Sequence, residues 1–201
     1  MASGSHGMPV ARAGLTPATV VGEAARLADD VGWDRLTLAG LAYRFGVAVP
    51  SLYKHIGGLD ALRREVAASS MREFGDALAT AIAGATKREA FRAMAYAFRG
   101  YARAHPGRYA STVRAPDPDD EEASAASAEV LETVARVMAG YGLEGTDAID
   151  ATLAVRSALH GFVSLEAAGG FGIPQDVDRS FERMVDLLDA ALRSWRPARR
   201  E

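Results

Sequence analysis

Closely spaced helix start and stop signals fill the sequence between residues 16 and 59. Thr16 can cap a helix whose first position is Pro17, and Gly32 can end that helix. Thr37 can cap a second helix, which Gly46 can end in a left-handed conformation. We therefore expect helices at residues 17–31, 38–45, about 50–56 and about 59–83.

Two of these expected helices are short and are joined by a tight turn that contains glycine. A longer helix precedes the pair and another follows it. This arrangement is typical of a helix-turn-helix, which places its second helix in the major groove of DNA. Residues 38–48 would form the first helix and the turn, and residues 50–56 would form the recognition helix.

The rest of the chain also has helical periodicity, and no segment alternates as a strand would. Further helices are expected at about residues 87–105, 108–113, 121–141, 146–168 and 177–195. The fold class is therefore all-α, with an N-terminal three-helix DNA-binding domain and a C-terminal helical bundle. We expect a tail or expression scar at residues 1–14, the DNA-binding domain at 15–58, a connecting helix at 59–83 and a ligand-binding and dimerisation domain at 84–201.

Composition excludes several classes of protein. The chain has no cysteine, which rules out disulfides and thiolate zinc sites and favours a cytoplasmic location. No apolar run reaches the ~18 residues that a membrane-spanning helix needs. Neither an HExxH nor a GxSxG pattern occurs, so we expect no enzyme, no cofactor and no metal. The net charge of −3 comes from the C-terminal part, because residues 1–70 carry seven basic and six acidic side chains.

The N-terminal motif resembles the TetR family of bacterial regulators. The resemblance covers residues 16 to about 66 as an ordered pattern. It includes Ala24-Ala25, Gly32-Trp33, Leu36-Thr37, Leu41-Ala42, Gly46-Val47, Ser51-Leu52-Tyr53-Lys54-His55 and Leu62. Around His160-Gly161 the chain is also similar to a subgroup named for a Trp-His-Gly motif, although no tryptophan precedes His160.

The resemblance implies a set of DNA contacts. Ala48, Ser51 and Lys54 match positions that face bases or groove walls. Thr37, Arg44, Tyr53 and His55 match positions where phosphate contacts are usual. Three of these residues have structural alternatives: Tyr53 could be a half-buried packing residue, His55 a core or solvated histidine, and Arg44 a surface charge.

The resemblance also implies a small-molecule effector and a homodimer. Residues that could line an effector site are Met71, Phe74, Leu78, Phe98, Tyr101, Arg156 and His160. Such aromatic faces more often form a filled core, and His160 could make an internal or interface hydrogen bond. Residues predicted for the dimer interface are Leu153, Val163, Phe181, Val185, Leu188 and Leu192.

The function that follows is a transcriptional regulator, most simply a repressor that an effector releases from a palindromic double-stranded operator. A two-fold dimer would set its recognition helices about 34 to 36 Å apart, which matches successive major grooves. The alternative is a helical carrier or small-molecule binding protein, which would leave the N-terminal motif unexplained.

Overall fold

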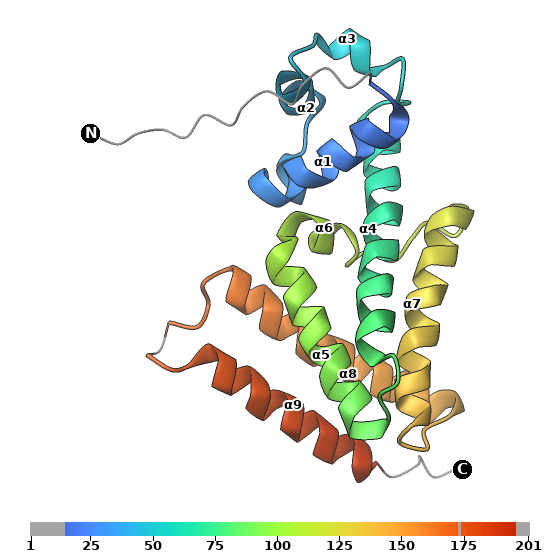
Figure 1. Cartoon of the computed structure of the whole chain (residues 1–201), viewed down its shortest axis with the longest axis vertical. Helices are drawn as coiled ribbons and strands as arrows, with labels where there is room; N and C mark the ends of the chain where they lie inside the picture. Colours follow the sequence, from blue (N-terminus) through green and yellow to red (C-terminus); the bar gives the residue numbers. More distant parts are fainter. Residues whose placement is uncertain (1–14, 173, 196–201) are drawn as a thin grey trace. The chain divides into compact units, whose positions relative to one another are not determined.

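The computed structural model describes residues 15–172 and 174–195, and in these residues it contains α-helices, one 3-10 turn and no strand (Figure 1). The all-α prediction is confirmed. The helices are α1 (Pro17–Val31), α2 (Leu38–Phe45), α3 (Val49–Leu52), α4 (Leu59–Ile82), α5 (Lys87–Ala104), α6 (Pro106–Ser111), α7 (Glu121–Ala139), α8 (Gly145–Ala167) and α9 (Val177–Arg193), with the 3-10 turn η1 (Trp33–Arg35) after α1.

The N-terminal helices begin and end where local signals predict. Thr16 and Thr19 form a capping box at the start of α1, where Pro17 occupies the first turn. The hydroxyl oxygen of Thr37 accepts a hydrogen bond from the Gly40 N–H at 3.1 Å. Gly46 ends α2 with φ +65°, a conformation that side chains with a Cβ rarely adopt.

The recognition helix is shorter than expected. α3 is regular only from Val49 to Leu52, whereas the sequence predicted a helix to about residue 56. The chain continues as a hydrogen-bonded turn in which the N–H groups of His55 and Ile56 both donate to the Leu52 carbonyl, at 2.8 and 3.1 Å. Gly57 and Gly58 follow, so the motif keeps its compact form although regular helix ends early.

The chain divides into two compact units. The first unit contains the residues up to 70 together with residues 107–115, and the second contains 71–106 and the residues from 116 onward. The sequence placed boundaries at 58/59 and 83/84 instead. The difference arises because Leu62 and Val66, in the first half of α4, are fully buried in the core of the first unit.

The core of the first unit joins α1, α2, α3 and the start of α4. Its buried side chains are mainly aliphatic, and they lie on the inward faces that the sequence pattern indicated. They are Val20, Ala24, Ala25, Leu27, Leu36, Leu41, Ala42, Leu52, Ile56, Leu62 and Val66. This core holds the helix-turn-helix in one arrangement.

In the second unit, α5 packs against α7, α8 and α9, and α8 packs against both α7 and α9 (Figure 1). Large buried side chains fill the space between these helices and the second half of α4. They include Leu78, Phe91, Met94, Met138, Leu159, Phe181 and Val185. No helix among the described residues is long and apolar enough to cross a membrane.

Candidate nucleic-acid interface

The turn between α2 and α3 is fixed by backbone hydrogen bonds. The N–H of Val47 donates to the Ala42 carbonyl at 3.0 Å, which closes the end of α2. Leu52 is fully buried and Ile56 nearly so, and both pack on the core of the first unit. One side of the recognition segment is therefore anchored, and its other side is available to a ligand.

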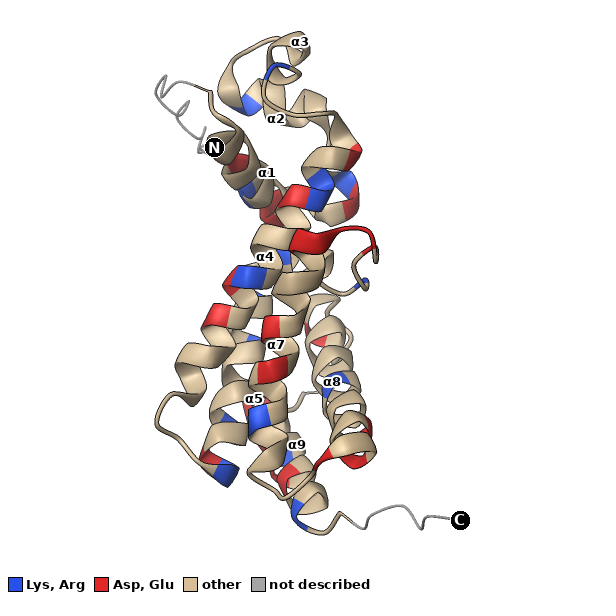
Figure 2. Ribbon diagram, turned by 90° about the vertical axis from the view of Figure 1, so that its right-hand side faces the viewer, with Lys and Arg blue, Asp and Glu red and all other residues tan. Residues whose placement is uncertain are grey.

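The surface around this motif lacks acidic side chains. Residues 37–58 contain no Asp or Glu, whereas they contain Arg44, Lys54 and His55. Figure 2 shows this as a stretch without red ribbon along α2 and α3. We call residues 37–58 the acid-free surface. Phosphate groups would meet no carboxylate repulsion there, although the whole chain is negatively charged.

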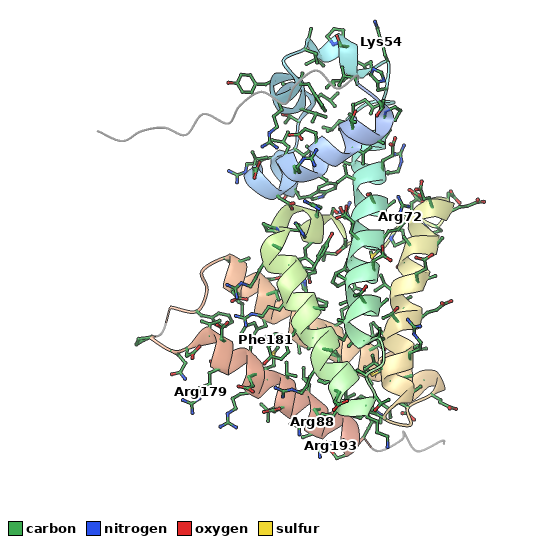
Figure 3. All side chains as sticks on the ribbon, in the orientation of Figure 1. Lys54, Arg72, Arg88, Arg179, Phe181 and Arg193 are labelled. Atoms are coloured by element: carbon green, nitrogen blue, oxygen red, sulfur yellow. The ribbon has the colours of Figure 1, made fainter. Side chains whose placement is uncertain are left out.

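The predicted contact residues of the recognition segment come together on this surface. Tyr53 is 57% exposed and Lys54 is exposed, and Figure 3 shows Lys54 at the end of the motif, pointing away from the core. Ala48 is exposed at the N-cap of α3, while Ser51 and His55 are half-buried. The segment thus presents hydroxyl, ammonium and imidazole groups together with a small apolar residue.

Two other predicted contacts have intramolecular partners. The exposed Thr37 caps α2, so its hydroxyl oxygen is already an acceptor although its proton can still be donated. Arg44 forms an ion pair with Asp30, and a second of its nitrogens lies 3.2 Å from Glu23. Arg44 therefore ties α2 to α1, and much of its charge is neutralised within the protein.

The sequence interpretation missed Tyr43, which precedes Arg44 on α2. Its side chain is 87% exposed, the largest exposed fraction among the large hydrophobic side chains of residues 15–172 and 174–195. An exposed tyrosine offers both a flat apolar ring and a hydroxyl group. Its spacing did signal this, because Leu41 and Ala42 face inward and the next position turns outward.

In the second unit, four residues predicted to line an effector site are buried together. Phe74, Phe98 and Tyr101 form an aromatic cluster, in which the Phe74 ring lies 5.2 Å from Phe98 and 5.3 Å from Tyr101 between centroids. Leu78 is buried one turn further along α4. Met71 is half-buried at the start of this row.

The two polar residues of that prediction lie on α8. Arg156 is exposed, so it does not join the buried aromatic cluster. His160 is half-buried, and its ring nitrogen lies 3.4 Å from the Ser164 hydroxyl one turn further on. A half-buried imidazole with a hydroxyl neighbour is consistent with the structural alternative that the sequence left open for His160.

Four of the six residues predicted for a dimer interface are buried within the protomer. Val163, Phe181, Val185 and Leu192 are at most 3% exposed, because they pack between α5, α8 and α9. In Figure 3 Phe181 points into this space, whereas Arg179 points away from it. Leu153 remains 55% exposed and Leu188 is half-buried. The helical period placed these residues on one stripe but could not tell which neighbour covers the stripe.

Comparison with known proteins agrees with this architecture. The family model described as "Tetracyclin repressor-like, C-terminal domain" matches residues 91–188. The HTH-type transcriptional regulator Rv0681 of Mycobacterium tuberculosis is 40% identical over 89% of this chain and 82% of its own length. The HTH-type transcriptional regulator YobS of Bacillus subtilis is 34% identical over 89% of this chain and 88% of its own length.

A solved structure shares the fold. A TetR variant from Acinetobacter baumannii, in complex with minocycline, superposes with a TM-score of 0.66, 24% identity and coverage of 92% of this chain and all of that chain. Transcriptional regulators of this kind are not enzymes, which agrees with the sequence prediction. Both relatives match over 89% of this chain, and the family model matches its C-terminal domain. The chain therefore belongs to the TetR family of helix-turn-helix transcriptional regulators.

Proposed function

We propose that this regulator represses transcription as a homodimer on a palindromic double-stranded DNA operator, and that a small-molecule effector releases it. The observation that carries the proposal is the acid-free surface, where exposed Tyr53 and Lys54 project from an anchored helix-turn-helix. The dimer, the direction of regulation and the effector are expectations that follow from the family and from the physical features below.

The recognition segment supplies the proposed DNA contacts. Lys54 donates to a phosphate or to guanine, and Ser51 and Ala48 meet base edges or the groove wall. Tyr53, His55 and Thr37 bind the phosphate backbone. These assignments follow the family positions, and the exposed or half-buried state of each side chain supports them.

On α2 we assign the backbone contact to Tyr43 and not to Arg44. The guanidinium of Arg44 already has Glu23 and Asp30 as ionic partners, so a phosphate would have to compete with two carboxylates. Tyr43 lies next to it with a hydroxyl at the end of an 87% exposed side chain. A phosphate oxygen can accept a hydrogen bond from that hydroxyl without displacing an internal partner.

For the homodimer we assign the outer faces of α8 and α9. Leu153 on α8 is 55% exposed and Leu187 on α9 is 71% exposed, and Ala190 and Ala191 lie exposed one turn after Leu187. A two-fold contact uses the same patch on both protomers, and small side chains allow helices to approach closely. The buried residues Phe181 and Val185 would support this face from inside the protomer.

The effector is proposed to bind near the aromatic cluster of Phe74, Phe98 and Tyr101. Aromatic and aliphatic side chains with few polar groups are typical linings of small-molecule sites, and Tyr101 adds a hydroxyl 3.5 Å from Glu73. A structural relative has been solved in complex with minocycline, which supports a small-molecule effector but does not locate its site. An effector shifts DNA affinity only if it binds the two conformational states unequally.

The direct test is fluorescence anisotropy of the full chain with a labelled DNA library at two salt concentrations. We expect sequence-selective binding that weakens as salt rises, because phosphate contacts release counterions. The Tyr53→Ala, Lys54→Ala double variant should lose selective binding, by about 100-fold or more if each side chain contributes about 1 to 3 kcal/mol. The selected DNA then serves to screen effectors for release.

The matched control is Lys87→Ala, which removes the only other lysine in the sequence, an exposed residue of the second unit. Its binding should equal that of the unmodified protein. Weak, unselective binding that the double variant leaves unchanged would contradict the regulator and favour a helical small-molecule binding protein instead.

A further inference from the structure

The segment of residues 107–115 belongs to the first unit, although it lies between α5 and α7 in the sequence. The whole of α5 and the whole of α7 belong to the second unit. The unit that carries the helix-turn-helix therefore includes a part of the chain that follows it by about fifty residues. We call residues 107–115 the returning segment.

Gly107 brings the returning segment into direct backbone contact with α1. A Cβ added at Gly107 would lie 2.0 Å from the carbonyl oxygen of Ala28 and 2.5 Å from the backbone nitrogen of Asp29. Backbone atoms cannot move aside as the end of a flexible side chain can. Only glycine fits this approach, so the contact between the two segments is close and specific.

The next residue, Arg108, is bound to Asp29 at both carboxylate oxygens. Its backbone N–H donates to Asp29 Oδ1 at 2.8 Å, and its side-chain Nε donates to Oδ2 at 2.7 Å. Both side chains are mostly buried. Two parallel charge-assisted hydrogen bonds fix orientation as well as distance, and solvent screens them less than it would a surface pair.

The end of α1 carries two such ties on adjacent residues. Asp29 binds Arg108 of the returning segment, and Asp30 forms the ion pair with Arg44 of α2. The ion pair of Arg44 is not the main link, because α1 also shares the buried core of the first unit with α2 and α3, through Leu27, Leu41 and Leu52 among others. We therefore expect the position of the last turn of α1 to affect the orientation of α2 and α3.

We propose that Arg108 is a positioning residue for DNA binding: by binding Asp29 it joins the returning segment and the last turn of α1 into one body and so orients the recognition segment. This inference rests on the proposed DNA-binding function. Arg108 itself touches no DNA, and its effect is on the fraction of molecules whose recognition segment is correctly placed.

The test compares Arg108→Ala with Arg114→Ala, an exposed arginine of the same segment, in the full chain. DNA affinity is measured over a series of salt concentrations with the operator selected from the library. Arg108→Ala should lower affinity about tenfold, as expected if one molecule in ten remains competent, without changing the slope of log affinity against log salt. Lys54→Ala, in contrast, should reduce that slope by about one. Arg114→Ala should leave the slope and affinity unchanged.

Hydrogen exchange gives a second readout that does not need DNA. In Arg108→Ala, amides of residues 28–31 and 107–112 should lose protection together while those of α8 keep theirs. The conservative variant Arg108→Lys, which keeps the charge and the backbone donor, should restore part of the protection and affinity. The reversed pair Asp29→Arg, Arg108→Asp should restore more than either single change does.

Three results would overturn the proposal. A salt slope reduced in Arg108→Ala with normal protection would make Arg108 a direct phosphate contact. Unchanged affinity and unchanged protection would show that the contact between Arg108 and Asp29 does not position the recognition segment. Lost protection with full DNA affinity would confine Arg108 to stability. If the unmodified chain binds no DNA, the proposed function fails, and the exchange data then decide separately whether the two segments form one body.

Discussion

At the acid-free surface of the first unit, Tyr43, Tyr53 and Lys54 are exposed. In the second unit, by contrast, Arg99 is buried beside the rings of Phe162 and Phe181 and pairs with two carboxylates. Polar and charged side chains thus have different roles in the two units. Where polar groups extend into solvent they are available to a partner, and where they are enclosed they hold helices together.

The pairing around Arg99 is extensive. Its Nε donates to Glu166 at 2.9 Å, its Nη2 donates to Glu166 and Asp178 at 2.5 and 2.7 Å, and its guanidinium lies 4.7 Å from the ring centre of Phe181. These contacts join α5, α8 and the start of α9. The hydrogen bond with Glu166 is the largest influence on the pKa of Arg99, which it raises, and the pKa of Glu166 is lowered by the same bond.

The largest expected effect is on stability, when the buried guanidinium of Arg99 is removed. Arg99→Ala leaves Glu166 without its main partner, so we expect unfolding free energy to fall by about 3 to 5 kcal/mol. Arg103→Ala is the control, because that exposed arginine reaches the same carboxylates only at 3.7 to 4.0 Å and should cost less than about 1 kcal/mol. Denaturant unfolding measures both variants. Equal losses of unfolding free energy would show that the buried arginine contributes no more to stability than the exposed one.

The second largest expected effect is on dimerisation, when exposed leucines of the second unit are replaced. Leu153→Glu combined with Leu187→Glu should weaken the proposed dimer by about 100-fold or more, because each leucine would otherwise be buried at about 1.5 to 3 kcal/mol. Sedimentation at several concentrations measures the dissociation. Leu131→Glu on α7, at a similar exposed fraction of 54%, should have no effect. Dissociation by Leu131→Glu alone would place the interface elsewhere.

A smaller expected effect is the pH dependence of stability that comes from Glu166. Because folding lowers its pKa, Glu166 contributes stability above its unfolded pKa of about 4.3, and this contribution is lost as pH falls toward its folded value. The melting temperature of the unmodified protein should therefore decline more steeply below about pH 4.3 than that of Glu166→Gln. Parallel pH profiles for the two proteins would show that the ionised Glu166 carboxylate contributes no stability through its bond with Arg99.

The smallest expected effect on DNA binding concerns Arg44, an arginine of the first unit that has two carboxylate partners within the protein. Because Glu23 and Asp30 engage its charge, Arg44→Ala should leave the salt slope of DNA binding unchanged and alter affinity by less than about threefold. Anisotropy over a salt series tests this. A slope reduced by about one would instead make Arg44 a phosphate contact, as the family position implies.

Much of the fold could be predicted because its signals are local. Thr16 with Pro17, and Thr37 with Gly46, act through hydrogen bonds or φ angles within a few residues of themselves. The recognition segment was predicted for the same reason, although α3 ends earlier than the pattern indicated. The assignments that changed, such as the covering of Phe181 and Val185, depend on which helix lies opposite, and periodicity does not contain that information.

The sequence alone determined the all-α class and the helix-turn-helix, since capping, turn chemistry and hydrophobic period are properties of short stretches. The family followed from the resemblance of residues 16 to about 66 to a known motif. Tertiary structure decided which charged side chains have partners within the protein. The partners of Arg44 lie up to 21 residues away, and those of Arg108 and Arg99 up to 79 residues away. Such ion pairs form only after the helices pack, because the folded core brings distant carboxylates within hydrogen-bond reach and excludes the water that would otherwise screen them.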